Sequence, residues 1–262
     1  MYGPATLQRM GKSDMTGPKT AFGDQLHAEK YRAAHESFRD YANRVASALS
    51  DDPDHFHRFR QMLLEQRYLP AGRIQSGVGS TKSVTPYNCY VSGTINDSFV
   101  HGEQNIMEMA KEAAATMRQG GGIGYDFSTL RPQNDLIKKL NSGASGPVSF
   151  MDIFDAVCRC IASAGHRRGA EMGVLRVDHP DVEEFIHAKQ PDRSAQLLWD
   201  FVARHASAEE HMPLFNALQR TLRLTGFNVS LAITDEFMEC LDKEEPFPLR
   251  FDGEIYRYVD PV

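Results

Sequence analysis

The sequence predicts an α/β fold in which a helical region precedes parallel strands that alternate with helices. Residues 24–70 show only the three- and four-residue apolar spacing of helices. From residue 88 onward, segments with the alternating pattern of strands take turns with helical segments, and glycine or proline separates most of them. Strands that alternate with helices in this way pair in parallel, because each helix returns the chain to the same edge of the sheet.

The composition and charge are those of an ordinary globular protein. The chain has 262 residues, of which 41% are hydrophobic and 24% are charged, enough to bury a sizeable core. A net charge of -6 provides no basic surface for wrapping nucleic acid, so we expect no nucleic-acid partner. No apolar run approaches the roughly 20 residues of a membrane span, and residues 1–12 lack a signal pattern. We therefore expect a cytoplasmic protein without a membrane segment.

We divide the chain into a flexible lead-in over residues 1–22, a helical region over 23–85 and a larger α/β region over 86–262. The lead-in is rich in glycine, proline, serine, threonine and lysine. In the helical region, apolar residues at helical spacing run from 24 to 49 and again from 54 to 66.

The α/β region is predicted to contain four strands separated by helices. Asp97 and Ser98 are placed to cap the helix after the first strand, and Pro147 is placed to begin the next helix. The predicted strands cover 88–95, 122–127, 172–177 and 227–234, the helices 99–119, 147–161, 178–186, 195–205, 208–222 and 235–241, and the loops 76–86 and 131–146. Most histidines fall on polar helix faces and are predicted to be solvated: His27, His35, His55, His57, His101, His187, His205 and His211.

Three consecutive glycines, Gly120–Gly122, follow a predicted helix and precede a predicted strand. Glycine lets the backbone approach a ligand closely and adopt positive φ. A dinucleotide-binding fingerprint needs the reverse order, with the strand before the glycines and the helix after them. The spacing therefore favours a tight structural turn, and a ligand contact stays open beside it.

Two arginines, Arg167 and Arg168, lie between Gly165 and Gly169. The guanidinium fork matches phosphate geometry, and flanking glycines let a loop adjust to an anionic ligand. Arg131 is a candidate third phosphate ligand. A solvated basic turn is the alternative interpretation, and composition does not separate the two.

The chain has four cysteines: Cys89, Cys158, Cys160 and Cys240. None lies in a C-x-x-C pair or in zinc-ligand spacing, so no metal site is predicted. Cys89 stands where a loop meets a strand and can be a reactive thiol, although a lone cysteine is more often a small buried hydrophobe. Cys158 and Cys160 are two residues apart on a predicted helix, which favours core packing over joint chemistry.

Taken together and in order, these segments resemble the large catalytic subunit of ribonucleotide reductases over about residues 24–262. The stretches GGGIGYDFSTLRP and SGASGPVSFMDIFD are most similar to the adenosylcobalamin-dependent class II enzymes. The matching segments are Leu69–Arg73, Tyr87–Val91, Asp97–Ser98, Gly120–Pro132, Ser142–Asp155, Arg167–Ala170, His179–Asp181, Phe185–Ile186 and Phe227–Ser230.

The resemblance implies a ten-stranded α/β barrel, of which residues 86–262 would be the first part. It implies reduction of ribonucleotides to 2′-deoxyribonucleotides for DNA synthesis by thiyl-radical chemistry. The implied cofactor is adenosylcobalamin, bound mostly by residues outside this chain, and the implied effectors are deoxynucleotides or ATP. The implied partners are the ribonucleotide substrate and a reductant of the thioredoxin or glutaredoxin type.

The resemblance also implies roles for single residues. Cys89 is similar to one of the two thiols that reduce the substrate and become a disulfide. The implied substrate contacts are Gly72, Asn88, Cys89 and Gly122, of which Gly72 departs from the family in residue type. The implied effector contacts are Asp97, Ser98, Arg131, Arg167 and Arg168. Residues 132–146 and 164–172 correspond to the first and second specificity loops, and the second carries effector identity to substrate choice.

The sequence departs from the family in several ways. The radical-bearing N-x-C-x-E arrangement does not occur in it, and neither does the partner thiol of Cys89. We therefore expect a fragment or one half of a split enzyme, inactive without a downstream polypeptide. Residues 190–222 look like an insertion. A class I enzyme with a separate metal-containing radical subunit, a non-catalytic nucleotide-binding module and an unrelated α/β protein stay open as alternatives, as does a homodimer.

Overall fold

The computed structural model describes residues 17–138, 140–161, 170–191, 193–205, 213–214 and 223–262. The chain forms two compact units that divide between Asn88 and Cys89. Within the described residues, no helix is long and apolar enough to cross a membrane.

The first unit is helical, as the spacing predicts, but its helices differ from the prediction in two places. Its helices are α1 (Ala21–Tyr31), α2 (Phe38–Leu49), α3 (Pro53–Leu64) and α4 (Gly72–Gly77). The predicted continuous helix over 24–49 is wrong, because the chain is extended at Arg32 and restarts at a capping box between Ser37 and Asp40. Sequence reasoning also missed α4, which has only six residues.

A small apolar core holds the first unit together. Tyr41, Val45 and Leu63 are fully buried between α2 and α3. His27 is also buried, at 7% exposure, so the prediction that it is solvated is wrong. Arg32 Nε donates to His27 Nδ1 at 3.1 Å, which puts the histidine proton on Nε2, where it faces Gln75 Oε1 at 2.9 Å. Burial lowers the pKa of His27, despite the opposing hydrogen bond to Gln75.

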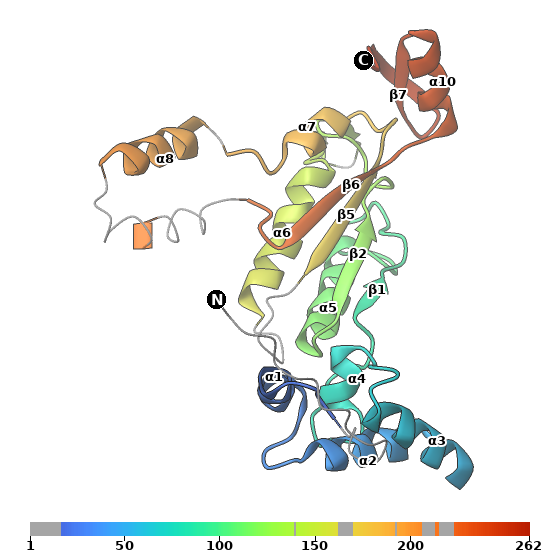
Figure 1. Ribbon diagram of the computed structural model, residues 1–262. Helices are drawn as coiled ribbons and strands as arrows, with labels where there is room; N and C mark the ends of the chain where they lie inside the picture. Colours follow the sequence, from blue (N-terminus) through green and yellow to red (C-terminus); the bar gives the residue numbers. More distant parts are fainter. Residues whose placement is uncertain (1–16, 139, 162–169, 192, 206–212, 215–222) are drawn as a thin grey trace. The chain divides into compact units, whose positions relative to one another are not determined.

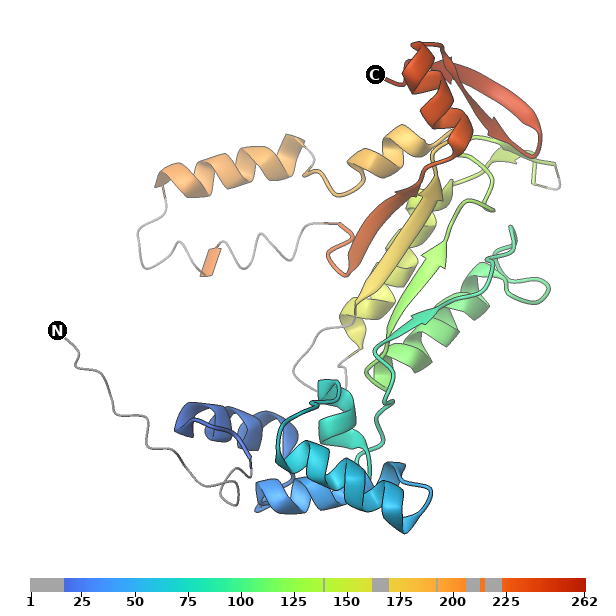
Figure 2. The same cartoon turned by 45° about the vertical axis from the view of Figure 1, so that its right-hand side comes forward.

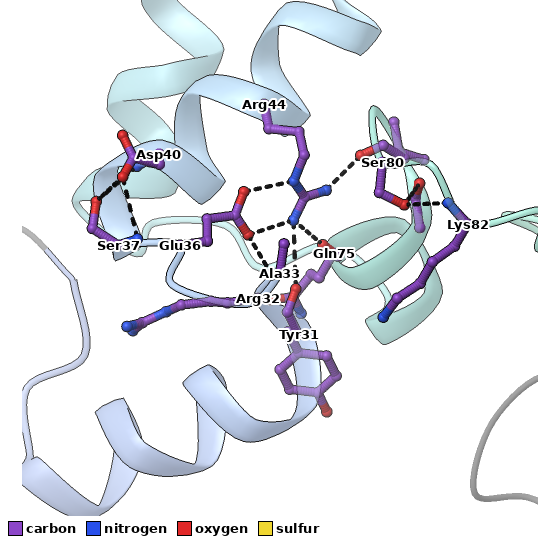
Figure 3. A network of polar contacts seen from close by, with 12 residues as sticks. Tyr31, Arg32, Ala33, Glu36, Ser37, Asp40, Arg44, Gln75, Ser80 and Lys82 are labelled. Atoms are coloured by element: carbon purple, nitrogen blue, oxygen red, sulfur yellow. Dashed lines mark hydrogen bonds and ion pairs between the residues drawn. The ribbon is translucent and has the colours of Figure 1, made fainter.

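A polar network around Arg44 ties α2 to α4 (Figure 3). The guanidinium binds both carboxylate oxygens of Glu36, at 2.7 and 3.0 Å. It also donates to the carbonyl oxygens of Gln75 at 3.0 Å and of Val78 at 2.5 Å. The Arg44 and Glu36 side chains are 13% and 9% exposed, so water screens this pair little.

The second unit is built on a four-stranded parallel sheet in the order β1-β2-β5-β6 (Figure 1). Its strands are β1 (Cys89–Val91), β2 (Gly122–Asp126), β5 (Glu171–Arg176) and β6 (Phe227–Ala232). All three pairings are parallel, as the alternation of strand and helix predicts. The first strand is shorter than the predicted 88–95.

One face of this sheet carries helices α5 (Ile106–Arg118) and α6 (Pro147–Cys160), as Figures 1 and 2 show from two directions. Ile123, Tyr125 and Phe227 point into the main core together with Phe154 of α6. Alternate residues of the same strands point the other way and are exposed or half-buried. This second face is covered by none of the described helices, and it presents mostly small or polar side chains: Cys89, Gly122, Gly124, Asn228 and Ser230.

The helix α5 begins later than the sequence predicts. Asn105, rather than Asp97 or Ser98, caps it by accepting the backbone N–H of Glu108 at 2.9 Å. The predicted cap is therefore wrong, because an irregular loop intervenes between the first strand and the helix. Asp97 is consequently available for a contact elsewhere.

The remaining elements surround the carboxyl ends of the sheet strands or follow them in the chain. They are β3 (Leu136–Ile137), β4 (Ser142–Gly143), α7 (Val182–His187), α8 (Arg193–His205), α10 (Asp235–Lys243), β7 (Phe247–Phe251) and β8 (Glu254–Val259). The predicted loop over 131–146 contains the short β3–β4 pair, and the predicted helix over 208–222 lies mostly outside the described residues. Sequence reasoning did not find the pairing of β7 with β8, which turns at Asp252 and Gly253 with φ of 50° and 84°.

Candidate functional site

The amino edge of the sheet brings Cys89 and Gly122 together. These residues begin β1 and β2 and are register partners, so two of the predicted substrate contacts are neighbours on the open face. Cys89 is an exposed free thiol, whereas Cys158 is buried in the core. The alternative interpretation of Cys89 as a small buried hydrophobic residue is therefore excluded. Gly72 and Asn88, the other predicted substrate contacts, belong to the first unit.

The glycine run before β2 has a structural cause as well. Gly120 has φ of 88°, and a Cβ on Gly121 would lie 2.8 Å from both the Tyr90 ring and the Thr116 side chain. These two glycines thus allow α5 to turn directly into β2. Gly72 is similarly close-packed, since a Cβ there would lie 2.8 Å from the Tyr31 ring.

The second predicted specificity loop enters the sheet at the same amino edge. Arg167 and Arg168 themselves lie outside the described residues. The loop's last residues are described: the Ala170 carbonyl accepts from Ile123 N at 3.1 Å, and Glu171 N donates to the Gly226 carbonyl at 2.9 Å. The segment therefore joins β5 beside the strands that carry Cys89 and Gly122.

A buried carboxylic acid lies directly under this junction. Glu171, the first residue of β5, is 2% exposed, and its Oε1 accepts the Tyr125 hydroxyl hydrogen bond at 2.9 Å. Burial raises the pKa of Glu171 to about 7, although hydrogen bonds from Tyr125 and the Cys158 thiol oppose the shift. Burial, together with the nearby Glu171 charge, likewise raises the pKa of Cys158 to about 12. Sequence reasoning did not find this cluster, because its members come from three separate elements.

Replacing Glu171 with Gln is expected to flatten the pH dependence of stability. The folded carboxyl binds its proton more tightly than the unfolded one, whose pKa is near 4.5, so wild-type stability falls as pH rises toward about 7. Glu171→Gln should remove this slope and stabilise the second unit by about 1–3 kcal/mol at pH 8. Urea unfolding between pH 5 and pH 8 tests this, with exposed Glu245→Gln as the control. Parallel pH profiles for Glu171→Gln and wild type would contradict it.

The carboxyl edge of the sheet brings together two of the predicted effector contacts. Arg131 Nε donates to Asp97 Oδ2 at 2.6 Å, and the Arg131 backbone N–H lies 3.4 Å from Oδ1 of the same carboxylate. Within the described part of the chain, the terminal nitrogens of Arg131 make no hydrogen bond. Ser98 is adjacent, and its hydroxyl accepts the backbone N–H of His101 at 3.2 Å. These residues follow β1 and β2, so they lie at the opposite edge from Cys89.

Asp97, Ser98 and Arg131 line a cavity of about 1070 Å³, which we call the carboxyl-edge cavity. A cavity of this size accommodates a nucleotide, since small-molecule sites are commonly about 300–1000 Å³. Its other walls are residues 132–146, which were predicted as the first specificity loop, the loop before α5, the start of α6 and the β7–β8 hairpin. The lining residues beyond the predicted three include Phe99, His101, Asp135, Leu136, Lys138, Phe150, Phe251, Asp252, Glu254 and Tyr256.

A smaller cavity of about 530 Å³ adjoins it and shares Asp97, Phe251 and Asp252 with it. Its two arginines are already paired, Arg176 with Asp178 and Arg250 with Glu236, each at 2.6 Å. With both arginines paired and no lysine in its lining, this cavity has less positive charge for an anion than the carboxyl-edge cavity, which also contains Lys138. Among the described residues there is no group of three or more His, Cys, Asp or Glu able to hold a metal ion.

The parallel sheet, with helices on one face and an open face opposite, is the arrangement of part of an α/β barrel. The chain belongs to the ribonucleotide reductase family: the family model described as "Ribonucleotide reductase, barrel domain" matches residues 87–259. The resemblance in the ordered sequence segments and the α/β fold class are both confirmed.

Two curated relatives illustrate the family match. The chain is 29% identical over 245 residues to the vitamin B12-dependent ribonucleoside-diphosphate reductase of Thermoplasma acidophilum, covering 92% of this chain and 27% of that protein. It is 30% identical over 227 residues to the enzyme of the same description from Mycobacterium tuberculosis, covering 83% and 28%. The chain therefore spans about a quarter of the length of these curated relatives.

A solved structure supports the fold. The alpha subunit of the Actinobacillus ureae class Id ribonucleotide reductase matches with a TM-score of 0.65 at 16% identity, covering 86% of this chain and 35% of that chain. At this identity the likeness shows the shared fold alone.

Proposed function

We propose that this chain supplies the first part of the catalytic barrel of an adenosylcobalamin-dependent ribonucleotide reductase. The observation that carries the proposal is the register pair of Cys89 and Gly122 on the open face of the sheet. The printed names of the relatives, which are vitamin B12-dependent reductases, support the choice of cofactor. Reduction of ribonucleotides to 2′-deoxyribonucleotides is the corresponding reaction.

In this reaction Cys89 acts as one of two reducing thiols. Two thiols together supply two electrons and two protons, and they end as a disulfide. The substrate loses its 2′-hydroxyl as water and gains hydrogen at the same carbon. A reductant of the thioredoxin or glutaredoxin type then returns the disulfide to two thiols. The exposure of Cys89 suits both contact with substrate and access by a reductant.

Adenosylcobalamin supplies the initial radical in this class. Neither of the two cavities described above contains Cys89, and both lie at the carboxyl edge of the sheet. No residue of this chain is therefore assigned to cofactor binding, and no step is assigned to this chain through the cofactor.

The carboxyl-edge cavity is the proposed effector site. Asp97 orients the Arg131 guanidinium, whose terminal nitrogens would bind effector phosphates together with Lys138. Arg167 and Arg168 stay predicted effector contacts but are not assigned to this cavity, because they lie outside the described residues and the segment that follows them joins the sheet at the amino edge. Ser98 and Asp97 would contact the sugar.

A nucleotide-binding module without catalysis is a second candidate, which the carboxyl-edge cavity would support by itself. None of the four cysteines lies in the N-x-C-x-E arrangement that carries the radical in the resembled family. Such a module would retain effector binding at the carboxyl-edge cavity. It would not reduce a substrate, even with a downstream polypeptide or a separate radical subunit.

A turnover assay tests the proposal. We expect no deoxycytidine nucleotide from these 262 residues with dithiothreitol and an effector, with or without adenosylcobalamin. A polypeptide carrying the N-x-C-x-E segment should restore turnover, and only in the presence of adenosylcobalamin. Turnover that needs a metal-containing radical subunit instead would indicate class I, and nucleotide binding without any turnover would indicate the module. Product from this chain alone would mean that one of its four cysteines carries the radical.

A further inference from the structure

We propose that the β7–β8 hairpin forms the base-binding wall of the carboxyl-edge cavity, with Tyr256 as the surface on which the effector base stacks. The inference rests on the proposed effector site and deepens it, because it assigns the recognition of the base to residues outside both specificity loops. The ligand class is a deoxynucleoside triphosphate.

The charges around the cavity orient such a ligand. Its cationic side chains, Arg131 and Lys138, belong to the segment that follows β2, whereas the hairpin contributes the carboxylates Asp252 and Glu254. Phosphates are attracted to the first wall and repelled by the second, so the base end of a nucleotide faces the hairpin. The first wall also holds two carboxylates, Asp97, which is paired with Arg131, and Asp135. On balance this wall is neutral and the hairpin carries two negative charges, so phosphates still favour the first wall.

Tyr256 differs from the three phenylalanines of the cavity in its packing rather than in its exposure, since Phe99 is 49% exposed. Phe99 and Phe150 stack on each other with ring centroids 6.1 Å apart. Phe251 packs edge-on against His179 at 5.6 Å. Within the described part of the chain, Tyr256 has no aromatic partner, and it is 44% exposed. A nucleobase stacks on such a ring regardless of its identity, because every base has a π face.

The Tyr256 ring is held near the predicted phosphate ligand. Partial burial and the carboxylates of Asp135 and Asp181 raise the pKa of Tyr256, while the Arg131 charge opposes the shift. Its hydroxyl therefore stays protonated and can donate to Asp135, which lies on the first specificity loop. Tyr256, Arg131 and Asp135 all line the carboxyl-edge cavity.

The hairpin that carries Tyr256 is anchored firmly enough to act as a wall. Phe247 and Leu249 are fully buried in a core shared with Val177 and Val182. Next to Tyr256, the Arg257 guanidinium donates to the Glu183 carboxylate at 2.5 Å. The position of the ring is thus set by the fold of the second unit rather than by a free loop.

Equilibrium binding of dATP, dGTP, dTTP and dCTP to the 262-residue chain, measured over a range of salt concentrations, tests the proposal. Tyr256→Ala should weaken the tightest of these ligands about tenfold or more, since one base–aromatic stack is lost. The dependence of Kd on salt should not change, because the phosphate contacts remain. Tyr256→Phe should bind like wild type. Tyr258→Ala should also bind like wild type, since this tyrosine lies on the same strand but lines neither cavity.

Two results would contradict base stacking on Tyr256 without contradicting the proposed effector site. One is a Tyr256→Ala chain that binds as tightly as wild type while Arg131→Ala binds weakly with a flatter salt dependence. The other is a loss in Tyr256→Phe as large as in Tyr256→Ala, because the hydroxyl rather than the ring would then matter. If the wild-type chain binds none of the four nucleotides, both the effector site and the base wall are wrong.

Discussion

Cys89→Ser is expected to abolish ribonucleotide reduction by the complete enzyme. Serine cannot give electrons to the substrate by forming a disulfide with the second thiol, so turnover should fall on the order of 10³-fold or more. Cys89 is exposed at the first position of a strand, and its side chain is not part of the core, so the substitution should leave the fold unchanged. The measurement is steady-state deoxynucleotide formation by the reconstituted enzyme with dithiothreitol.

Cys160→Ser provides the matched control for this prediction. Cys160 is also an exposed free thiol in the second unit, but it stands at the end of α6 rather than beside Gly122. The Cys160→Ser enzyme should therefore retain wild-type turnover and the wild-type unfolding midpoint. Equal turnover by Cys89→Ser and wild type would remove Cys89 from the reducing pair.

Arg131→Ala is expected to weaken deoxynucleotide binding at the carboxyl-edge cavity by about 30-fold or more. The substitution removes a phosphate ligand and leaves the Asp97 carboxylate unpaired where the phosphates would bind. Stability should change by less than about 1 kcal/mol, because both side chains of the pair are roughly 30% exposed and water screens them. Isothermal titration of the effector and urea unfolding separate the two effects.

Arg118→Ala is the control for Arg131. Arg118 is an exposed arginine at the end of α5 and lines neither cavity. Its loss lowers the net positive charge by the same amount, so any general electrostatic effect on an anionic ligand appears in both variants. An effector Kd that rises equally in both would indicate that Arg131 makes no specific contact.

Several features of the candidate site were within reach of sequence reasoning. Cys89 is the second residue of the predicted strand 88–95, and Gly122 is the first residue of the predicted strand 122–127. Parallel strands place their first residues at one edge, so the strand assignments put Cys89 and Gly122 near each other. Asp97 and Arg131 each follow such a strand, which places both near the opposite edge. Their direct contact, across 34 residues of sequence, is a property of the folded chain.

Other features had no local signal. The burial of His27 depends on Gln75, which is 48 residues away, and on a helix break that apolar spacing does not reveal. In the sequence, Glu171 is one more charged residue at the start of a strand. In the folded sheet its side chain points toward Tyr125 and α6. The hairpin residues Phe251 and Tyr256 carry no motif, and only the packing of β7 and β8 on the second unit brings them to the cavity.

The sequence by itself determined the alternation of strands and helices, the parallel sheet and the family, because apolar period and turn chemistry act over a few residues at a time and motifs are read in order. The tertiary structure alone decided which face of the sheet stays open, which charges meet at its carboxyl edge and which side chains wall the cavity. Those outcomes depend on residues that are distant in the sequence: Asp97 and Arg131, which are 34 positions apart, form an ion pair, and Tyr256 of the hairpin lines the same cavity. No local pattern encodes such contacts, since they form only when separate elements pack into one core.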